Sequence, residues 1–290
     1  MRTFADFNPI AVTVWFLAVT GLAMFSSDPV IYVIALTGAV LLYVVRNGRK
    51  HHGIHLFAPV IFLITALINP LVSHNGGTVL FVMNNNPVTL EALIYGVCTA
   101  VMITAILYLF KSYSQIMTSD RLLYVFGMFS PKLALIFSMS LRYVPLFGRQ
   151  AKKITASQTA MGLYKDDNIA DSFRGGMRIF SVLITWALEN GIITADSMTA
   201  RGYGIGRRSH FSLFIFRTAD VLLICLSVIF SVLTVYLTWD IEFVFYPYFK
   251  IPDAGIKNAV GYAVYGLMAV MPVFIEIREV VKWRYLRSKI

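Results

Sequence analysis

Apolar runs long enough to cross a lipid bilayer dominate this sequence. A spanning helix needs about 20 apolar residues, within a range of about 17–25. Six runs reach that range: 10–27, 29–45, 54–73, 88–110, 213–239 and 256–277. With 58% hydrophobic and only 14% charged residues, the chain carries more apolar surface than its own core can hide. The sequence therefore predicts an all-α, polytopic membrane protein with about six transmembrane helices, the first of them uncleaved.

Two further apolar stretches, 131–147 and 177–195, are interrupted by charged residues. Lys132 and Arg142 lie in the first stretch, and Arg178 and Glu189 lie in the second. A charge near the centre of a spanning helix costs about 2.5–3.5 kcal/mol on insertion scales. We therefore expect these stretches to form amphipathic helices that are cytoplasmic or partly embedded, and not complete spans.

The distribution of Lys and Arg predicts the orientation. With both termini in the cytoplasm, 22 of the 25 Lys and Arg fall on the cytoplasmic side, as the positive-inside rule requires. We therefore expect three parts: 1–110 with four spans, a cytoplasmic region 111–210, and 211–290 with two spans and a basic tail. The net charge of +10 then reflects cytoplasmic loops, and we expect no nucleic-acid partner.

The loops that this topology places outside are short. Residues 73–77 and 83–87 have the composition of turns and flank a small apolar strip, 78–83. The last outer loop, 240–255, carries aromatic residues typical of a membrane interface.

No catalytic or metal centre is predicted. His51, His52 and His55 form the one histidine cluster, but no acid accompanies them, and we interpret them as interfacial. Gly202–Gly206 is glycine-rich, yet no Lys-Ser or Lys-Thr pair follows it at the spacing of a nucleotide-binding loop. We expect a non-enzyme that binds no cofactor and no metal.

Three acids lie near the ends of predicted spans. Acids inside a membrane often have functional roles, but proton or ion relays need several at mid-depth. We expect Glu91, Asp220 and Glu276 to reach the interface or to pair locally, Asp220 with Arg217 and Glu276 with Arg278.

A six-residue pattern, S-x-T-A-x-G, occurs twice, at Ser157–Gly162 and at Ser197–Gly202. Ala and Gly allow close backbone approach to a partner, and Arg201 offers a planar fork of donors that suits carboxylates. Small residues on both sides of an Arg are typical of a helix end that docks onto a partner protein. They are equally typical of a helix C-terminus, with Gly as cap and Arg favoured by the helix dipole. The residues alone leave both interpretations open.

The second copy and its neighbours resemble a known family. Asp196–Gly204 resembles the second Ala-Arg-Gly signature of the transmembrane T component of energy-coupling factor transporters. Ser140–Leu146 and Gln150–Gly162 are similar to the segment that leads into the first signature of that family. Asn8-Pro9 and Asn69–Leu71 are similar to recurrent features of one subgroup. The resemblance extends over essentially the whole chain.

The resemblance implies a non-catalytic coupling subunit of an ATP-driven importer of a micronutrient, either a vitamin or a metal ion, in a prokaryotic cell membrane. Its implied partners are two cytoplasmic ABC-type ATPases and a small membrane subunit that captures the substrate. Two long coupling helices would cross on the cytoplasmic side, each ending in a motif that sits in a groove of one ATPase. By this mapping the docking residues are Ala200, Arg201 and Gly202 at one end, and Ala160, Met161 and Gly162 at the other.

Met161 departs from the family pattern, because it stands where Arg is expected. Met makes adaptable apolar contacts but does not pair with carboxylates. Docking at this end is therefore either weaker or made to a different ATPase with an apolar groove, and our hypothesis is that the two ATPases are non-identical. Two other classes stay open. A stand-alone secondary transporter or permease would bind its substrate at the bilayer midplane, and a membrane-embedded enzyme would need a His and Glu constellation.

Overall fold

The computed structural model describes residues 3–47, 53–73, 75–83, 86–163, 169–206, 214–241, 243–250, 252 and 255–287. The chain divides into two compact units. Unit 1 comprises Met1–Arg121 and Phe214–Ile290, and unit 2 comprises Leu122–Leu213.

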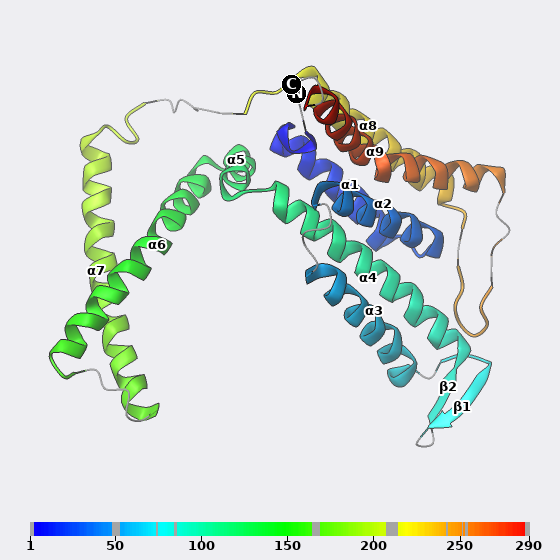
Figure 1. Ribbon diagram of the computed structural model, residues 1–290, viewed down its shortest axis with the longest axis horizontal. Helices are drawn as coiled ribbons and strands as arrows, with labels where there is room; N and C mark the ends of the chain where they lie inside the picture. Colours follow the sequence, from blue (N-terminus) through cyan, green and yellow to red (C-terminus); the bar gives the residue numbers. More distant parts are fainter. Residues whose placement is uncertain are drawn as a thin grey trace. The chain divides into compact units, whose positions relative to one another are not determined.

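Helices form almost all of the described part of both units (Figure 1). Unit 1 contains a 3-10 turn η1 (Phe4–Asp6), helices α1 (Pro9–Phe25), α2 (Pro29–Asn47), α3 (Gly53–Val72), α4 (Leu90–Ile116), α8 (Thr218–Thr238) and α9 (Ile256–Arg287), and strands β1 (Val79–Met83) and β2 (Asn86–Thr89). Helix α5 (Ser119–Phe129) crosses the boundary, and unit 2 contains α6 (Pro131–Ala160) and α7 (Ile169–Ala200).

Five helices of the described chain are long and apolar enough to cross a membrane: α2, α4, α7, α8 and α9. Helix α1 and the Phe57–Val72 part of α3 are apolar but shorter. The prediction of an all-α polytopic membrane protein is confirmed. The six predicted runs correspond to α1–α4, α8 and α9. Helix α7 was not expected to be a complete span. It is long and apolar enough to cross a membrane, although its mean hydropathy is the lowest of the five. Arg178 lies near one end of its apolar stretch, so the remainder carries few charges.

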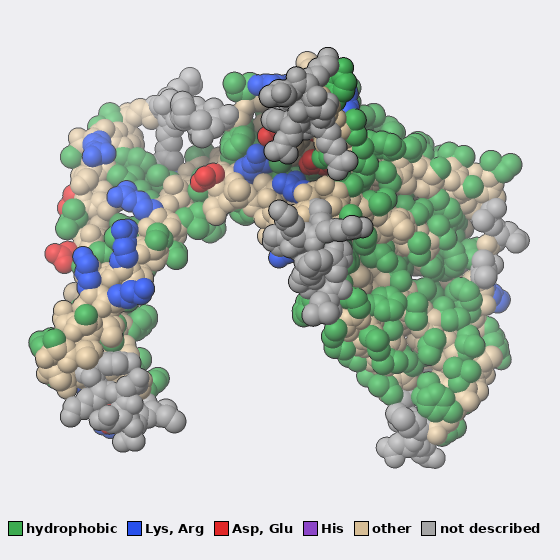
Figure 2. Space-filling model, viewed as in Figure 1, with side chains coloured by type: hydrophobic (Ala, Val, Ile, Leu, Met, Phe, Trp, Pro, Cys, Tyr) green, Lys and Arg blue, Asp and Glu red, His purple; other side chains and the backbone are tan. Residues whose placement is uncertain are grey.

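Small residues let the helices of unit 1 pack closely. A Cβ atom on Gly38 of α2 would lie 2.9 Å from the Cβ of Ala269 in α9. A Cβ atom on Gly96 of α4 would lie 2.7 Å from the carbonyl oxygen of Ala66 in α3. Such small-residue contacts are characteristic of helix packing in membranes, where close van der Waals contact replaces the hydrophobic effect. Figure 2 shows that the visible surface of this unit is mostly hydrophobic.

Two buried aromatic side chains tie α1 to α9. Trp15 is fully buried and donates from its indole nitrogen to the carbonyl oxygen of Met268 at 3.1 Å. Tyr265 is also fully buried and donates from its hydroxyl to the carbonyl oxygen of Val19 at 3.1 Å. A polar atom buried without such a partner would cost a kcal/mol or more. These bonds therefore fix the two helices in register.

The apolar strip predicted to lie between two turns is a strand. β1 and β2 pair antiparallel and precede α4 directly. Glu91, buried at the start of α4, accepts hydrogen bonds from the backbone N–H of Thr78 at 3.3 Å and from its hydroxyl at 2.7 Å. Glu91 therefore anchors the hairpin to the start of α4.

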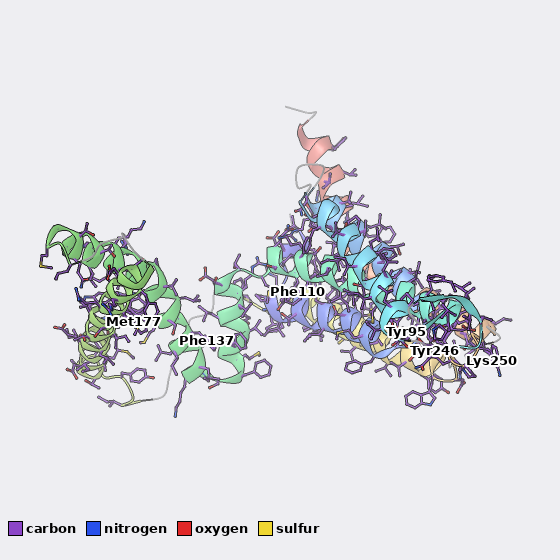
Figure 3. All side chains as sticks on the ribbon, turned by 90° about the horizontal axis from the view of Figure 1, so that it is seen from below. Tyr95, Phe110, Phe137, Met177, Tyr246 and Lys250 are labelled. Carbon is purple, nitrogen blue, oxygen red and sulfur yellow. The ribbon has the colours of Figure 1, made fainter. Side chains whose placement is uncertain are left out.

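The glycines before β1 have no room for a side chain. Gly76 has a φ of +140°, and a Cβ atom there would lie 2.6 Å from a Glu91 carboxylate oxygen. Gly77 donates its N–H to the carbonyl oxygen of Pro247 at 2.8 Å, and a Cβ atom there would overlap the Tyr248 ring. The hairpin is thereby held against the loop that joins α8 to α9. Figure 3 shows Tyr246 of the same loop beside Tyr95 of α4, with ring centroids 5.9 Å apart.

Asp220 contacts Arg217, as predicted, but through the backbone N–H of Arg217, whereas Glu276 has a different partner from the one predicted. Asp220 accepts from the backbone N–H of Asn8 at 3.0 Å and from the backbone N–H of Arg217 at 2.9 Å, so it caps its own helix and holds the start of α1. Glu276 lies 3.7 Å from the guanidinium of Arg46 in α2. The predicted pairing with Arg278 is wrong, because the folded helices bring a distant cation closer than the adjacent one.

Candidate functional site

Helices α6 and α7 form an antiparallel crossed pair within unit 2 (Figure 1). The hydroxyl groups of Tyr143 on α6 and Thr194 on α7 lie 3.0 Å apart. Phe147 meets Trp186 edge to face, with ring centroids 5.9 Å apart. These contacts join the middle of α6 to the C-terminal half of α7 in an antiparallel pair, so the two helices end at opposite ends of the pair.

The C-terminus of α6 closes with a Schellman motif. Gly162 has a φ of +69°, in the left-handed region that favours glycine. Its N–H donates to the carbonyl oxygen of Thr159 at 3.0 Å, and the N–H of Leu163 donates to that of Gln158 at 2.9 Å. Met161 is the cap residue, and its side chain is 64% exposed.

The C-terminus of α7 closes in the same way. Gly202 has a φ of +82° and donates its N–H to the carbonyl oxygen of Thr199 at 2.9 Å. The N–H of Tyr203 donates to the carbonyl oxygen of Met198 at 3.0 Å. Arg201 occupies the cap position and is exposed. The two copies of S-x-T-A-x-G therefore form the same helix ending.

The hydroxyl groups of the repeat are used inside the helices. Ser157 donates to the carbonyl oxygen of Lys153 at 3.1 Å, and Ser197 donates to that of Ile193 at 2.7 Å. Both threonines of the repeat likewise donate to backbone carbonyl oxygens of their own helices. What each end presents outward is the exposed Ala, the cap side chain and the glycine turn.

The two ends lie far apart on the pair. Arg178 donates from its guanidinium to the carbonyl oxygen of Leu163 at 3.2 Å, which places the end of α6 beside the first third of α7. From Arg178 to Ala200, α7 rises by about 30 Å at 1.5 Å per residue. The two ends are therefore separate surfaces of the pair.

Exposed cations gather on the same pair. Figure 2 shows Lys and Arg side chains along unit 2 with few acids near them. The exposed cations of α6 and α7 include Arg142, Arg149, Lys152, Lys153 and Arg174. This surface favours partners that carry negative charge.

The described residues hold no group of three or more His, Cys, Asp or Glu that would bind a metal ion. His51, His52 and the side chain of His55 lie outside the described residues.

A family model described as "CbiQ: cobalt transport protein" matches residues 5–213, which include both helix ends. The chain belongs to the CbiQ family. This is the family of the T components of energy-coupling factor transporters, so the resemblance seen in the sequence is confirmed. The chain is accordingly a membrane transport protein. No curated protein matches it.

Sequence reasoning about this CbiQ family member located both helix ends but missed what surrounds them. The bond from Arg178 to Leu163 and the burial of Gln158 depend on how α6 and α7 cross. The glycine in each repeat did signal the left-handed turn.

Proposed function

We propose that this chain is the non-catalytic coupling subunit of an ATP-driven micronutrient importer, and that Ala160–Gly162 and Ala200–Gly202 dock onto two cytoplasmic ABC-type ATPases. The observation that carries the proposal is the pair of exposed helix ends with the same backbone geometry, about 30 Å apart on a basic unit. Each end is rigid, because its cap hydrogen bonds are complete.

The chemistry of the second end favours an acidic groove. Arg201 presents five donors in a fixed fork, which matches a carboxylate in two places at once. The flanking Ala200 and Gly202 carry almost no side chain, so the partner's backbone can approach closely. Removing one partner of a buried, hydrogen-bonded charge pair at an interface weakens binding by about 2–5 kcal/mol.

The first end favours an apolar groove. Met161 occupies the same position as Arg201 but offers a flexible thioether. This difference supports two non-identical ATPases, one with carboxylates and one with an apolar pocket at the corresponding place.

The apolar face of α7 supports a membrane partner for unit 2. Exposed apolar residues recur on it every three or four positions, which places them on one face: Phe173, Met177, Phe180, Ile184, Leu188 and Ile192. Because this apolar face is exposed, we propose that it contacts the small capture subunit. A closing motion of the ATPases would then move α6 and α7 together and tilt that subunit. The proposal places both termini and residues 111–210 on the cytoplasmic side of a prokaryotic cell membrane.

The test is co-purification of the full chain with its genomically neighbouring ATPases and membrane proteins from mild detergent. The proposal predicts recovery of two ATPases and one small membrane protein with the wild-type chain, and loss of one ATPase with Arg201→Glu. Uptake that persists without ATPases and follows an ion gradient would contradict the proposal and identify a secondary transporter.

A further inference from the structure

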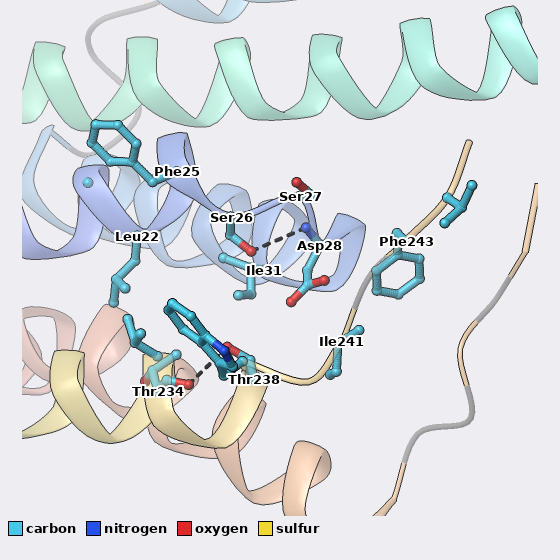
Figure 4. A pocket seen from close by; sticks show the side chains of 14 residues that line it. Leu22, Phe25, Ser26, Ser27, Asp28, Ile31, Thr234, Thr238, Ile241 and Phe243 are labelled. Carbon is cyan, nitrogen blue, oxygen red and sulfur yellow. Dashed lines mark hydrogen bonds between the residues drawn. The ribbon is translucent and has the colours of Figure 1, made fainter. Parts of the chain in front are cut away.

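A cavity of about 620 Å³ opens in unit 1, far along the chain from the docking ends. It lies between the end of α1, the start of α2, the end of α8 and the residues that follow α8 (Figure 4). Its size falls within the range of about 300–1,000 Å³ that is typical of sites for small molecules. Most of its wall is apolar, with Leu22, Ile31 and Ile241 among the lining residues.

One carboxylate points into this cavity. Asp28 is only 3% exposed, and its oxygen Oδ1 has no hydrogen-bond partner. The Ser26 hydroxyl accepts from the backbone N–H of Asp28 at 3.2 Å, and no Lys, Arg or His lines the described wall. Figure 4 shows both carboxylate oxygens directed into the open space. Because a buried charge without a partner is costly, this atom calls for a donor that the described residues do not supply.

Aromatic side chains line the same cavity. Phe25, Trp239 and Phe243 all contribute to its wall, and Trp239 is 77% exposed. The faces of aromatic rings attract cations, Trp most strongly. A single carboxylate beside aromatic rings suits an organic ammonium ion. It does not suit Ca²⁺, which takes six to eight oxygen ligands.

An apolar hollow of about 540 Å³ on α8 shares a wall with this cavity. Val235 and Trp239 line both spaces, and Ser231, Val232 and Tyr236 complete the hollow. Helix α8 is one of the candidate spans, so the hollow lies on a surface suited to hydrocarbon. A cavity that holds one carboxylate and adjoins an apolar hollow suits an amphipathic molecule with a charged head.

We propose that the cavity binds a primary ammonium group attached to an apolar chain, with Asp28 as the counter-ion and Trp239 against the head. The ammonium carries N–H donors for Oδ1, which a quaternary ammonium lacks, and the tail lies along α8. Two sources share this chemistry: an ethanolamine lipid from the bilayer and a soluble long-chain amine. Burial raises the pKa of Asp28 to about 6, so the carboxylate is largely ionised at pH 7.

The test uses the full chain in detergent, titrated by native mass spectrometry with three probes. The probes are phosphatidylethanolamine, phosphatidylcholine with the same acyl chains, and dodecylamine. We expect the ethanolamine lipid to bind at least tenfold more tightly than the choline lipid, and we expect Asp28→Asn to abolish this preference. Asp240→Asn is the matched control, because that carboxylate is exposed and pairs with Lys257 outside the cavity.

Each outcome decides the proposal. Binding of the ethanolamine lipid that depends on Asp28 supports a lipid source, and binding of dodecylamine alone that depends on Asp28 supports a soluble amine. Equal binding of the two lipids together with no amine binding overturns the proposal, as does binding that Asp28→Asn leaves unchanged. If Asp28→Asn does not fold, two other measurements decide the proposal. Trp239→Leu should bind dodecylamine severalfold more weakly than the wild-type chain does. The wild-type chain should bind dodecylamine but not dodecanol.

Discussion

Met161 and Arg201 occupy the same position in two helix ends that share the same backbone hydrogen bonds. Each follows the last helical residue and precedes a glycine with positive φ. The ends differ in side-chain chemistry but not in backbone geometry. If they bind two ATPases, the cap side chain is therefore the residue that distinguishes the partners.

Replacing the cap side chain of α7 with that of α6 tests this assignment. Arg201→Met should weaken binding of one ATPase by about 2–5 kcal/mol, because it leaves carboxylates of the partner unpaired. Binding of the other ATPase should stay unchanged. The measurement is a titration of each purified ATPase against the membrane-embedded chain. Arg201→Lys is the control, because it keeps the charge and loses the planar fork. Its affinity for the ATPase should lie between those of the wild-type chain and Arg201→Met. Equal loss of both ATPases in Arg201→Met would contradict the assignment.

The positive φ of Gly202 predicts a stability cost on adding a side chain. Gly202→Ala should lower the free energy of unfolding by about 1–2 kcal/mol, because the left-handed conformation strains any residue with a Cβ atom. Gly176 lies inside α7 with open space around it, so Gly176→Ala should be neutral or stabilising by up to about 1 kcal/mol. Thermal unfolding in detergent compares the two variants. A cost at Gly176 equal to that at Gly202 would rule out the cap geometry.

The close contact of Gly77 with Tyr248 predicts a second steric effect. Gly77→Ala should destabilise unit 1 by about 1–3 kcal/mol, because the Tyr248 ring must move and the bond to Pro247 is strained. Gly148→Ala, in open space on α6, is the matched control. Protease resistance of the hairpin in detergent is the readout. Unchanged resistance in Gly77→Ala would show that the hairpin does not rest on the α8–α9 loop.

Asp28 predicts a dependence of stability on pH. Its pKa is raised in the folded chain to about 6, from 3.8, because burial disfavours the charged form. A group with a raised folded pKa favours the folded state below its unfolded pKa and loses that contribution as pH rises through the folded pKa. The described titratable side chains that act on Asp28 are Tyr32 and Tyr262, and an ordinary tyrosine hydroxyl is neutral in this window.

Without bound amine, the wild-type chain should therefore lose about 2–3 kcal/mol of stability between pH 4 and pH 8 relative to Asp28→Asn. Added dodecylamine should restore that stability at pH 8 in the wild-type chain and not in the variant. Melting temperatures of both proteins across this range are the measurement. If the melting temperatures of the two proteins changed in parallel with pH, Asp28 would not be buried as a charge.

The helices were largely predictable, because each apolar run carries its own signal. The six runs correspond to six helices of unit 1, and the two glycines of the repeat locate the ends of α6 and α7. The two stretches interrupted by charges, 131–147 and 177–195, were harder to predict. The free-energy cost of inserting a charge into a membrane depends on where the charge lies along the helix. Helix α7 meets the criterion for a span although Arg178 and Glu189 lie within it.

Features that depend on tertiary packing were not predictable. Arg46 and Glu276 are far apart in the sequence, and only the packing of α2 against α9 brings them within 3.7 Å. The strip that forms β1 is short and apolar throughout, so no alternation distinguished it from a turn segment. The cavity at Asp28 combines residues from α1, α2 and α8, and no local pattern marks it.

Site-specific photo-crosslinking tests the central claim most directly. A crosslinking residue is placed at Met161, at Arg201 or at Tyr236 as a membrane-facing control, and the native complex is irradiated in its membrane. The account predicts that Met161 and Arg201 each crosslink to an ATPase, that the two ATPases are different polypeptides, and that Tyr236 crosslinks to neither. Crosslinks from Met161 and Arg201 that reach no ATPase would contradict it.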